Sequence, residues 1–239
     1  MTKQTQSGIW ITGASSGIGR AAAIEFAKTG AGVFVSSRRE AELERLRAEL
    51  NRKKLAIGIF PCNVASSSNV ARTVKKIIAG HQIDCLINNA GITSFKKAEA
   101  NSITEINDVI NTNLLGAIYT IKYVLPYMIE QGSGAIINIL SVAAKKIFTN
   151  SSVYAASKSG LLAYTNSLRE EVRRYNIRII NVVPGAIETP IWAEAVRIEN
   201  AGRMMRAEDI GKLLVRLYLQ KGNMVTEEIV VKPITGDLI

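Results

Sequence analysis

The sequence predicts an α/β domain, in which a doubly wound parallel sheet of about seven strands carries helices on both faces. Two observations lead to this prediction. Short apolar runs rich in β-branched residues alternate with longer stretches of helical periodicity. These runs are almost uninterrupted, which is typical of strands buried on both faces of a parallel sheet. Strict alternation requires right-handed crossovers, and because no linker or repeat divides residues 1–239, we expect a single domain.

Each predicted strand is a short apolar run bounded by polar or turn-forming residues. The strands are predicted at 8–12, 32–36, 56–61, 85–88, 135–140, 178–183 and 228–231. The helices between them are predicted from amphipathic periodicity at 18–29, 40–53, 66–79, 103–131, 152–175 and 207–220. Ser102 and Glu105 are spaced as a capping box that opens the longest of these helices.

The composition excludes several classes of protein. With 47% hydrophobic residues the chain is not disordered, and no run approaches the roughly 18 apolar residues of a membrane-spanning helix. The first ten residues lack the apolar core of a secretion signal. Cys62 and Cys85 lie in apolar runs without metal-ligand or disulfide spacing, so we expect core thiols of a cytoplasmic protein and no metal site. We expect His81 at the surface or capping a helix.

The charge balance leaves two interpretations open. Lys and Arg number 30 and Asp and Glu 20, and the net charge of +10 favours acidic partners such as nucleic acid or a phosphorylated cofactor. The alternative is an ordinary solvated basic surface, because the densest basic cluster, at 38–54, also contains glutamates, as an exposed helix does.

A glycine-rich turn follows the first predicted strand and precedes the first helix. Glycines there let the backbone approach a pyrophosphate, and the free N–H groups of the next helix favour the anion. The spacing is not that of a Walker phosphate loop, and it also differs from the plain G-x-G-x-x-G dinucleotide fingerprint. The turn contains the candidate cofactor-binding residues Gly13, Ser15, Ser16, Gly17, Ile18 and Gly19.

The second predicted strand ends in Ser37, Arg38 and Arg39, where a dinucleotide-binding fold meets the adenosine ribose. An acidic residue there would bind the ribose hydroxyls of NAD, whereas a guanidinium suits the 2′-phosphate of NADP. We therefore expect NADP(H), with Arg38 and Ser37 at the phosphate and Arg39 paired with glutamates of the next helix.

Tyr154 and Lys158 are four residues apart, and so they are neighbours on one face of a predicted helix. An ammonium beside a phenol favours the phenolate, which would let Tyr154 exchange a proton near neutral pH. A surface Tyr–Lys pair is the alternative. Ser141 strengthens the catalytic interpretation because it follows a predicted strand, at the edge where open α/β sheets bind ligands.

Together these residues resemble the short-chain dehydrogenase/reductase family, in its single-domain, NADP-preferring branch, over residues 8–220. The resemblance implies a Rossmann-like fold. It rests on six motifs in family order: Thr12 to Gly19, Asn88-Asn89-Ala90-Gly91, Asn113 to Gly116, Ser141, Tyr154 to Lys158, and Pro184 to Thr189.

The resemblance also implies the roles of individual residues. Ser141 would polarise the substrate oxygen, Tyr154 would act as acid and base, and Lys158 would lower the pKa of the tyrosine and bind the nicotinamide ribose. Asn113, the fourth catalytic candidate, would kink its helix and hold a water that links Lys158 to solvent. The further residues implied at the cofactor are Asn89, Ala90, Gly91, Pro184, Gly185, Ile187 and Thr189.

Two features depart from the family pattern. Asn63 and Val64 follow the third strand where the family has an aspartate and a small apolar residue. An asparagine oxygen can still accept a hydrogen bond from the adenine amino group, so both remain cofactor candidates. The C-terminus lacks the glycine-rich tail of many relatives and resembles the branch of hydroxy-acid dehydrogenases and small-ketone reductases.

We therefore expect an NADP(H)-dependent oxidoreductase that interconverts a secondary alcohol and a ketone. The alternatives are a 3-oxoacyl-carrier reductase, a non-catalytic NADP-binding sensor or nucleic-acid-associated protein, and an epimerase or dehydratase. A short substrate loop at 186–207 contains Ile191, Trp192 and Met204 as lid or pocket residues and indicates a small substrate.

The expected partner is a small carbonyl or alcohol substrate, with no nucleic acid and no membrane. We expect a homotetramer or homodimer, with Leu161, Leu162 and Tyr164 suited to a helix-mediated interface.

Overall fold

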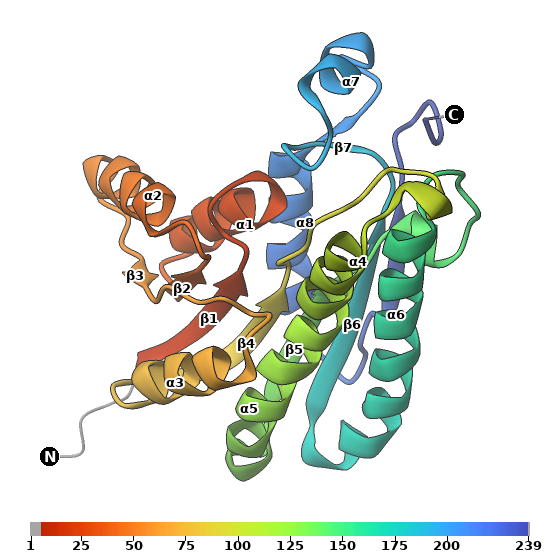
Figure 1. Ribbon diagram of the computed structural model, residues 1–239. Coiled ribbons are helices and arrows are strands. Elements are labelled where there is room, and N and C mark those ends of the chain that lie inside the picture. The colour runs from red at the N-terminus through yellow and green to blue at the C-terminus, as the bar shows by residue number, and fades with distance from the viewer. Residues whose placement is uncertain (1–5, 239) are drawn as a thin grey trace, which may run out of the picture.

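The computed structural model describes residues 6–238 and shows a three-layer α/β fold (Figure 1). Seven strands form one sheet in the order β3-β2-β1-β4-β5-β6-β9, and every neighbouring pair is parallel. Their bounds are β1 Gln6–Thr12, β2 Gly32–Ser36, β3 Gly58–Ile59, β4 His81–Asn88, β5 Gly134–Ile139, β6 Ile177–Pro184 and β9 Glu228–Val231. The predicted fold class, a doubly wound parallel sheet, is confirmed.

Helices cover both faces of this sheet. The residues of β1 alternate between two cores: Ile9 and Ile11 pack against α1, α2 and α8, whereas Trp10 packs against α3, α5 and α6. Buried apolar side chains on both faces explain why the strands read as continuous apolar runs. The helix bounds are α1 Gly17–Lys28, α2 Glu40–Arg52, α3 Ser67–Ile78, α4 Ile103–Ile110, α5 Gly116–Gln131, α6 Ser152–Val172, α7 Glu194–Glu199 and α8 Ala207–Tyr218.

The long helix predicted at 103–131 is interrupted. A π-helical turn at Asn111–Leu115 separates α4 from α5. An extra residue in a helical turn bends the helix axis, and such turns are frequent at functional sites. The capping box between Ser102 and Glu105 is present at the start of α4, so that prediction is confirmed.

Three predictions are wrong. His81 opens β4 and packs its ring on Phe34, with ring centroids 4.6 Å apart, because the strand starts four residues earlier than its apolar run indicates. The strand predicted at 56–61 forms a ladder only over Gly58–Ile59. Leu161 is only 1% exposed and belongs to a core cluster, so it is not an interface residue.

The segment between β6 and α8 has structure of its own, which the sequence did not reveal. Two short strands, β7 Ile187–Glu188 and β8 Met205–Arg206, pair in parallel, and α7 lies between them. Figure 1 shows α7 standing away from the sheet at the top of the molecule. This segment, residues 186–206, is called the lid below.

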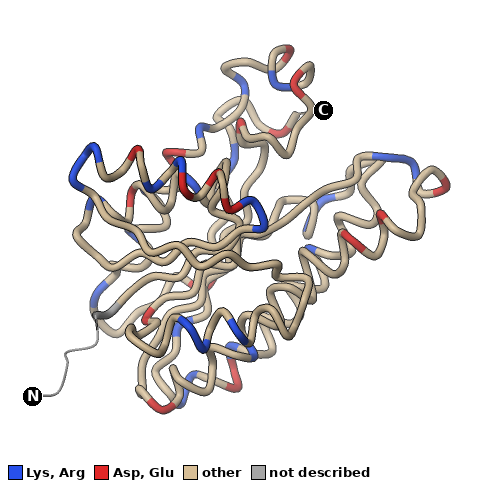
Figure 2. Tube along the Cα trace, turned by 60° about the vertical axis from the view of Figure 1, so that its left-hand side comes forward, with Lys and Arg blue, Asp and Glu red and all other residues tan. Residues whose placement is uncertain are grey.

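Charged residues of both signs lie on the helices and loops around a largely uncharged sheet (Figure 2). Ion pairs within single helices, such as Arg45 with Glu42 and Lys53 with Glu49, show that part of the basic surface is locally neutralised. Over residues 6–238, none of the helices is both long and apolar enough to cross a bilayer. The expectation about a secretion signal falls partly on residues 1–5, which lie outside the described residues.

Candidate active site

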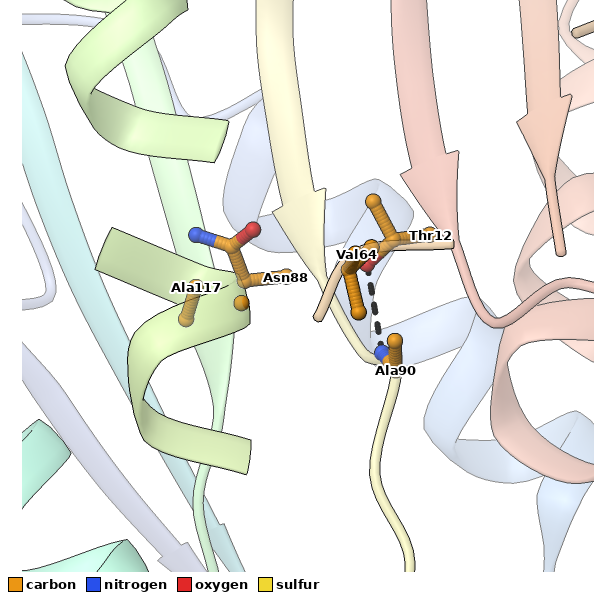
Figure 3. A pocket seen from close by; sticks show the side chains of 6 residues that line it. Thr12, Val64, Asn88, Ala90 and Ala117 are labelled. Carbon is orange, nitrogen blue, oxygen red and sulfur yellow. Dashed lines mark hydrogen bonds between the residues drawn. The ribbon is translucent and has the colours of Figure 1, made fainter. Parts of the chain in front are cut away.

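The candidate residues gather at the carboxyl ends of the parallel strands. The strand order reverses between β1 and β4, since β2 and β3 lie beyond β1 while β5 and β6 lie beyond β4. Such a switch point leaves a crevice outside the strand ends, where open α/β sheets bind their ligands. Figure 3 shows this region, with Thr12 at the end of β1 and Ala90 just after β4.

The turn after β1 has positions where a side chain would be strained or would clash with neighbouring atoms. Gly13 and Gly17 have φ of +67° and +54°, in the left-handed region that disfavours side chains. A Cβ on Gly13 would lie 2.7 Å from the Cα of Ala90, and one on Gly19 would lie 2.4 Å from Nδ2 of Asn89. The first turn of α1 receives no side-chain cap from Ser16. This cradle of bare backbone at a helix N-terminus fits the pyrophosphate of a dinucleotide.

Asn89 and Thr12 tie the glycine turn to the end of β4. The Asn89 side-chain amide donates to the carbonyl oxygens of Thr12, at 2.9 Å, and of Gly13, at 3.2 Å. The Thr12 hydroxyl in turn accepts from the backbone N–H of Asn89 at 3.1 Å. It also accepts from the backbone N–H of Ala90 at 3.2 Å, the bond drawn in Figure 3. The two turns that border the crevice are therefore fixed relative to each other.

Arg39 lies over the glycine turn after β1. Its guanidinium donates to the Ser15 hydroxyl, with Nη2 2.9 Å away, and to the Ser16 hydroxyl, also at 2.9 Å. None of the ion pairs among the described residues joins Arg39 to a glutamate, so that expectation is wrong. Ser37 accepts from the Arg39 backbone N–H at 2.9 Å and so fixes the bend that directs the side chain back over the glycine turn. Arg38 is exposed beside it.

Asn63 and Val64 lie in the loop after β3, and Val64 lines the region beside Thr12 and Ala90. The Asn63 side-chain oxygen accepts from the Ala65 N–H at 3.2 Å, which leaves one lone pair for a ligand. Val64 is buried, and a Cβ on Gly116 would lie 2.8 Å from its Cγ2. Gly116 thus lets the start of α5 approach the strand ends.

Ser141, Tyr154 and Lys158 converge from β5 and α6. Ser141 follows β5 and caps the 3₁₀ turn Val142–Ala144, with its hydroxyl accepting from the Ala143 N–H at 3.1 Å. The same side chain lies close enough to the Tyr154 phenol to influence its pKa. The Lys158 ammonium lies 5.8 Å from the centre of the Tyr154 ring and donates to the Ile139 carbonyl at 2.7 Å.

Burial dominates the electrostatics of this trio. It raises the pKa of Tyr154, and the nearby Ser141 side chain opposes that rise. Burial also lowers the pKa of Lys158 to about 8. The expected acidification of the phenol by the ammonium is not seen, because loss of hydration is the larger effect on the phenol and raises its pKa. The phenol is therefore protonated at neutral pH.

Asn113 lies in the π turn and bridges α6 to the loop after β4. It is 1% exposed; its oxygen accepts from the Ile92 N–H and its amide donates to the Ile92 carbonyl, both at 2.8 Å. The amide also donates to Ser157 at 3.0 Å. A Cβ on Gly91 would lie 3.4 Å from the Asn113 oxygen and 3.6 Å from the Lys158 ammonium. The structure thus brings together all four candidate catalytic residues around the Gly91 turn.

The turn after β6 closes the crevice from the other side. Thr189 lies against the glycine turn, since a Cβ on Gly17 would be 3.1 Å from the Thr189 Cβ. Ile187 is buried in β7, and Pro184 ends β6. The Gly185 N–H donates to the Val231 carbonyl at 2.8 Å, which ties this turn to β9.

Sequence reasoning missed a buried ladder of asparagines across the sheet. Asn88 donates to Asn138 at 3.0 Å, and Asn138 donates to Asn181 at 3.2 Å, at matched register positions of β4, β5 and β6. Thr120 and Thr165 complete the ladder at its two ends. The signal was a single asparagine near the end of each of three apolar strands.

A second missed feature is an aromatic cluster beside the phenol. Phe95, after β4, stacks on Trp192 of the lid, with centroids 4.9 Å apart and planes 21° apart. The Phe95 ring also packs edge-to-face with the Tyr154 ring, with centroids 6.1 Å apart. Phe95 remains 43% exposed, so this cluster lines the approach to Tyr154.

The chain matches a family model described as short chain dehydrogenase over residues 8–200. Among curated proteins it is 37% identical to a sepiapterin reductase of Chlorobaculum tepidum, over 95% of this chain and 96% of that protein. It is 31% identical to a 3-oxoacyl-[acyl-carrier-protein] reductase of Thermotoga maritima, over 92% of this chain and 93% of that one.

Solved structures of related oxidoreductases have the same fold. A metagenomic short-chain oxidoreductase in complex with NADP superposes with a TM-score of 0.83 at 28% identity, covering 95% of this chain and 97% of that one. Levodione reductase superposes with a TM-score of 0.86 at 29% identity, covering 95% and 96%.

Proposed function

The chain belongs to the short-chain dehydrogenase/reductase family and is an oxidoreductase that uses a nicotinamide cofactor; from this premise we propose that it is an NADP(H)-dependent reductase of a small ketone. The observation that carries the proposal is the convergence of Ser141, Tyr154 and Lys158 beside the Gly91 turn, at the carboxyl ends of β4 and β5. A protein that only binds the cofactor needs no proton donor there.

The residues of the crevice fit NADP(H) from one end to the other. The bare backbone at Gly13, Gly17 and Gly19 would accept the pyrophosphate. Arg39 and Arg38 offer guanidinium groups, and no acidic side chain follows β2 before Glu40 to repel a 2′-phosphate. The NADP complex among the similar structures supports the same choice. The cofactor, when bound, supplies the hydride.

The chain's own groups then act on the carbonyl oxygen. The hydroxyls of Ser141 and Tyr154 lie close together and can both donate to one substrate oxygen, where negative charge develops. Tyr154 gives up its proton as the alcohol forms. A protonated phenol at neutral pH suits this direction, because reduction needs an acid and oxidation needs a base. Lys158, two of whose three protons have no protein acceptor among the described residues, can hold the neighbouring ribose.

The substrate class follows from the surroundings of Tyr154. The exposed Phe95 and the half-buried Trp192 stacked on it offer a flat apolar surface beside the proton donor, which favours a ketone attached to a planar ring. The similarity to a sepiapterin reductase points the same way. A 3-oxoacyl-carrier substrate is the second candidate, since a chain with a net charge of +10 attracts an acidic carrier.

Tyr154→Phe tests the mechanism. The variant keeps the ring and loses the proton, so it should bind NADPH like the wild type while turnover falls by about a hundredfold or more. NADPH fluorescence measures binding, and loss of absorbance at the nicotinamide band measures turnover. Sepiapterin, small cyclic diketones and 3-oxoacyl thioesters form the panel.

Tyr127→Phe on the exposed face of α5 is the matched control and should be fully active. Equal activity of the Tyr154→Phe and wild-type proteins would refute the proposed role of the phenol. Reduction of the thioesters alone would favour the second candidate.

A further inference from the structure

The last residues of the described chain lie over the site. After β9, the segment at 232–238 turns back, and Asp237 Oδ2 accepts from Lys232 Nζ and from Lys146 Nζ, both at 3.0 Å. Lys145 pairs in the same way with Glu228 of β9. Two consecutive lysines of the loop after Ser141 are thus each bound to the C-terminal part of the chain. Figure 1 shows the C-terminal segment rising beside this loop at the top of α6.

Asp237 is not an ordinary surface carboxylate. Its side chain is 7% exposed, whereas those of Lys146 and Lys232 are 54% and 42% exposed. Its other oxygen, Oδ1, is buried and has no hydrogen-bond partner among the described residues. That oxygen lies against the turn after β6, since a Cβ on Gly185 would be 3.5 Å away. Pro233 covers the same glycine at 3.2 Å.

The contacts continue from Asp237 to the reacting groups. The Lys146 N–H donates to the Val142 carbonyl at 2.8 Å, and the Ala144 N–H donates to the Ser141 carbonyl at 2.9 Å. One compact turn therefore joins Lys146 to Ser141. On the other side, Gly185 is fixed to Val231 and Thr189 contacts Gly17. Asp237 is the point at which the turn that carries Ser141 meets the turn that borders the cofactor crevice.

We propose that Asp237 is a positioning residue: it clamps Lys146 of the Ser141 turn against the Pro184–Gly185 turn and so fixes the proton-donating pair relative to the cofactor. The inference rests on the proposed reductase activity for its kinetic test, but not for its structural one. Exposed ion pairs contribute little to stability. The carboxylate of Asp237 is only 7% exposed, and removing Lys146 leaves it with a single cationic partner.

A kinetic test distinguishes the contact of Asp237 with the Ser141 turn from its contact with the Pro184–Gly185 turn. Lys146→Met should lower kcat about tenfold and leave NADPH affinity within about twofold of wild type, because only the Ser141 turn is released. Asp237→Asn should lower kcat similarly and also weaken NADPH binding, because Asp237 contacts Gly185 as well. The double variant should lose no more kcat than either single one, since both break the same contact. Lys146→Arg, which keeps the charge, should retain wild-type kcat.

Hydrogen exchange of the peptide 141–148 provides a readout that needs no turnover. Its amides should exchange faster in Lys146→Met and Asp237→Asn, while peptides of α2 stay unchanged. Lys53→Met and Glu42→Gln, which break exposed ion pairs of α2, are the matched controls and should match wild type in kcat and exchange.

Unchanged exchange at 141–148 in both variants, or additive losses of kcat in the double variant, would overturn the clamp. If the wild-type protein reduces no carbonyl, the proposed function fails, yet faster exchange at 141–148 would still establish the clamp. The two failures are therefore distinguishable.

Discussion

At the scale of single residues, burial decides which protonation states the site can use. Tyr154 is 8% exposed and Lys158 is 4% exposed. Loss of hydration disfavours the charged form of each, which raises the pKa of the phenol and lowers that of the ammonium. The pair therefore favours a neutral acid over an ion pair, which is consistent with reduction as the proposed direction.

The lowered pKa of Lys158 has a measurable effect on stability. Between about pH 8 and the ordinary lysine pKa of 10.5, the unfolded chain binds a proton at this lysine that the folded chain releases. Stability from this group should therefore rise with pH across that window. The buried thiols of Cys62 and Cys85, whose pKa burial raises, act in the opposite direction. We therefore predict how the free energy of unfolding of the wild type compares with that of Lys158→Met. Urea titrations should show the wild-type value rising relative to the variant value from pH 8 to pH 10.

A constant difference over this range would show that Lys158 stays charged in the folded protein. The raised pKa of Tyr154 should lower the stability of the wild type only above pH 10, the ordinary pKa of a tyrosine. That range lies above the pH values compared.

Arg39, more than its neighbour Arg38, should determine whether the protein prefers NADPH or NADH. It is anchored on Ser15 and Ser16, beside the pyrophosphate cradle, while Arg38 is exposed. Arg39→Leu should weaken NADPH binding by about tenfold, equivalent to roughly 1.4 kcal/mol, and leave NADH binding nearly unchanged. Arg38→Leu should give a smaller change. Fluorescence titration with both cofactors measures the ratio, and a larger effect at Arg38 would contradict this assignment.

At the scale of elements, the asparagine ladder fixes the strands that carry the site. Each asparagine of the ladder lies just before a residue of the site. Asn88 directly precedes Asn89, Asn138 lies three residues before Ser141, and Asn181 lies three residues before Pro184. A slip of one residue in any strand pairing would put an apolar side chain opposite an amide and leave that amide unpaired. The ladder therefore favours the one register in which the three turns meet.

Asn138→Ala should destabilise the protein because it leaves Asn88 and Asn181 without one partner each in the middle of the sheet. Unsatisfied buried groups of this kind cost on the order of 2–3 kcal/mol in total. Chemical unfolding measures the loss. Asn107→Ala, on the exposed face of α4, is the control and should change stability by less than about 0.5 kcal/mol. A similar loss at both positions would refute the special cost of the ladder.

The elements also show what the sequence can and cannot predict. Periodicity is a local signal, so it placed β9 at Glu228–Val231 and most of α2 correctly. It could not indicate that Arg39 turns back to Ser15, since that contact joins residues 24 positions apart. The contact between Lys146 and Asp237 spans 91 positions and depends on how the chain end folds over the sheet. The pKa of Tyr154 depends on burial, which no motif contains.

At the scale of the whole molecule, the edge of the sheet at β9 favours assembly. β9 is the last strand in the order and pairs only with β6 among the described residues. Apolar side chains are exposed on it and beside it: Val230 is 47% exposed, Met224 66% and Leu219 52%. Exposed edge strands of this kind readily pair with another chain. Of the residues expected at a helix-mediated interface, Leu161 is buried, whereas Leu162 and Tyr164 are half-buried.

We therefore predict that two copies of the chain associate through β9 and the end of α8. Val230→Lys places a charge at the centre of this surface, which should shift the protein toward monomers because a desolvated ammonium without a partner opposes pairing. Light scattering with size-exclusion chromatography measures the mass. Ile103→Lys is the matched control: it replaces a still more exposed apolar residue, 72% exposed at the start of α4, and should leave the mass unchanged. If the Ile103 variant dissociates and the Val230 variant does not, the chains meet through the helices at α4 and not along the sheet edge.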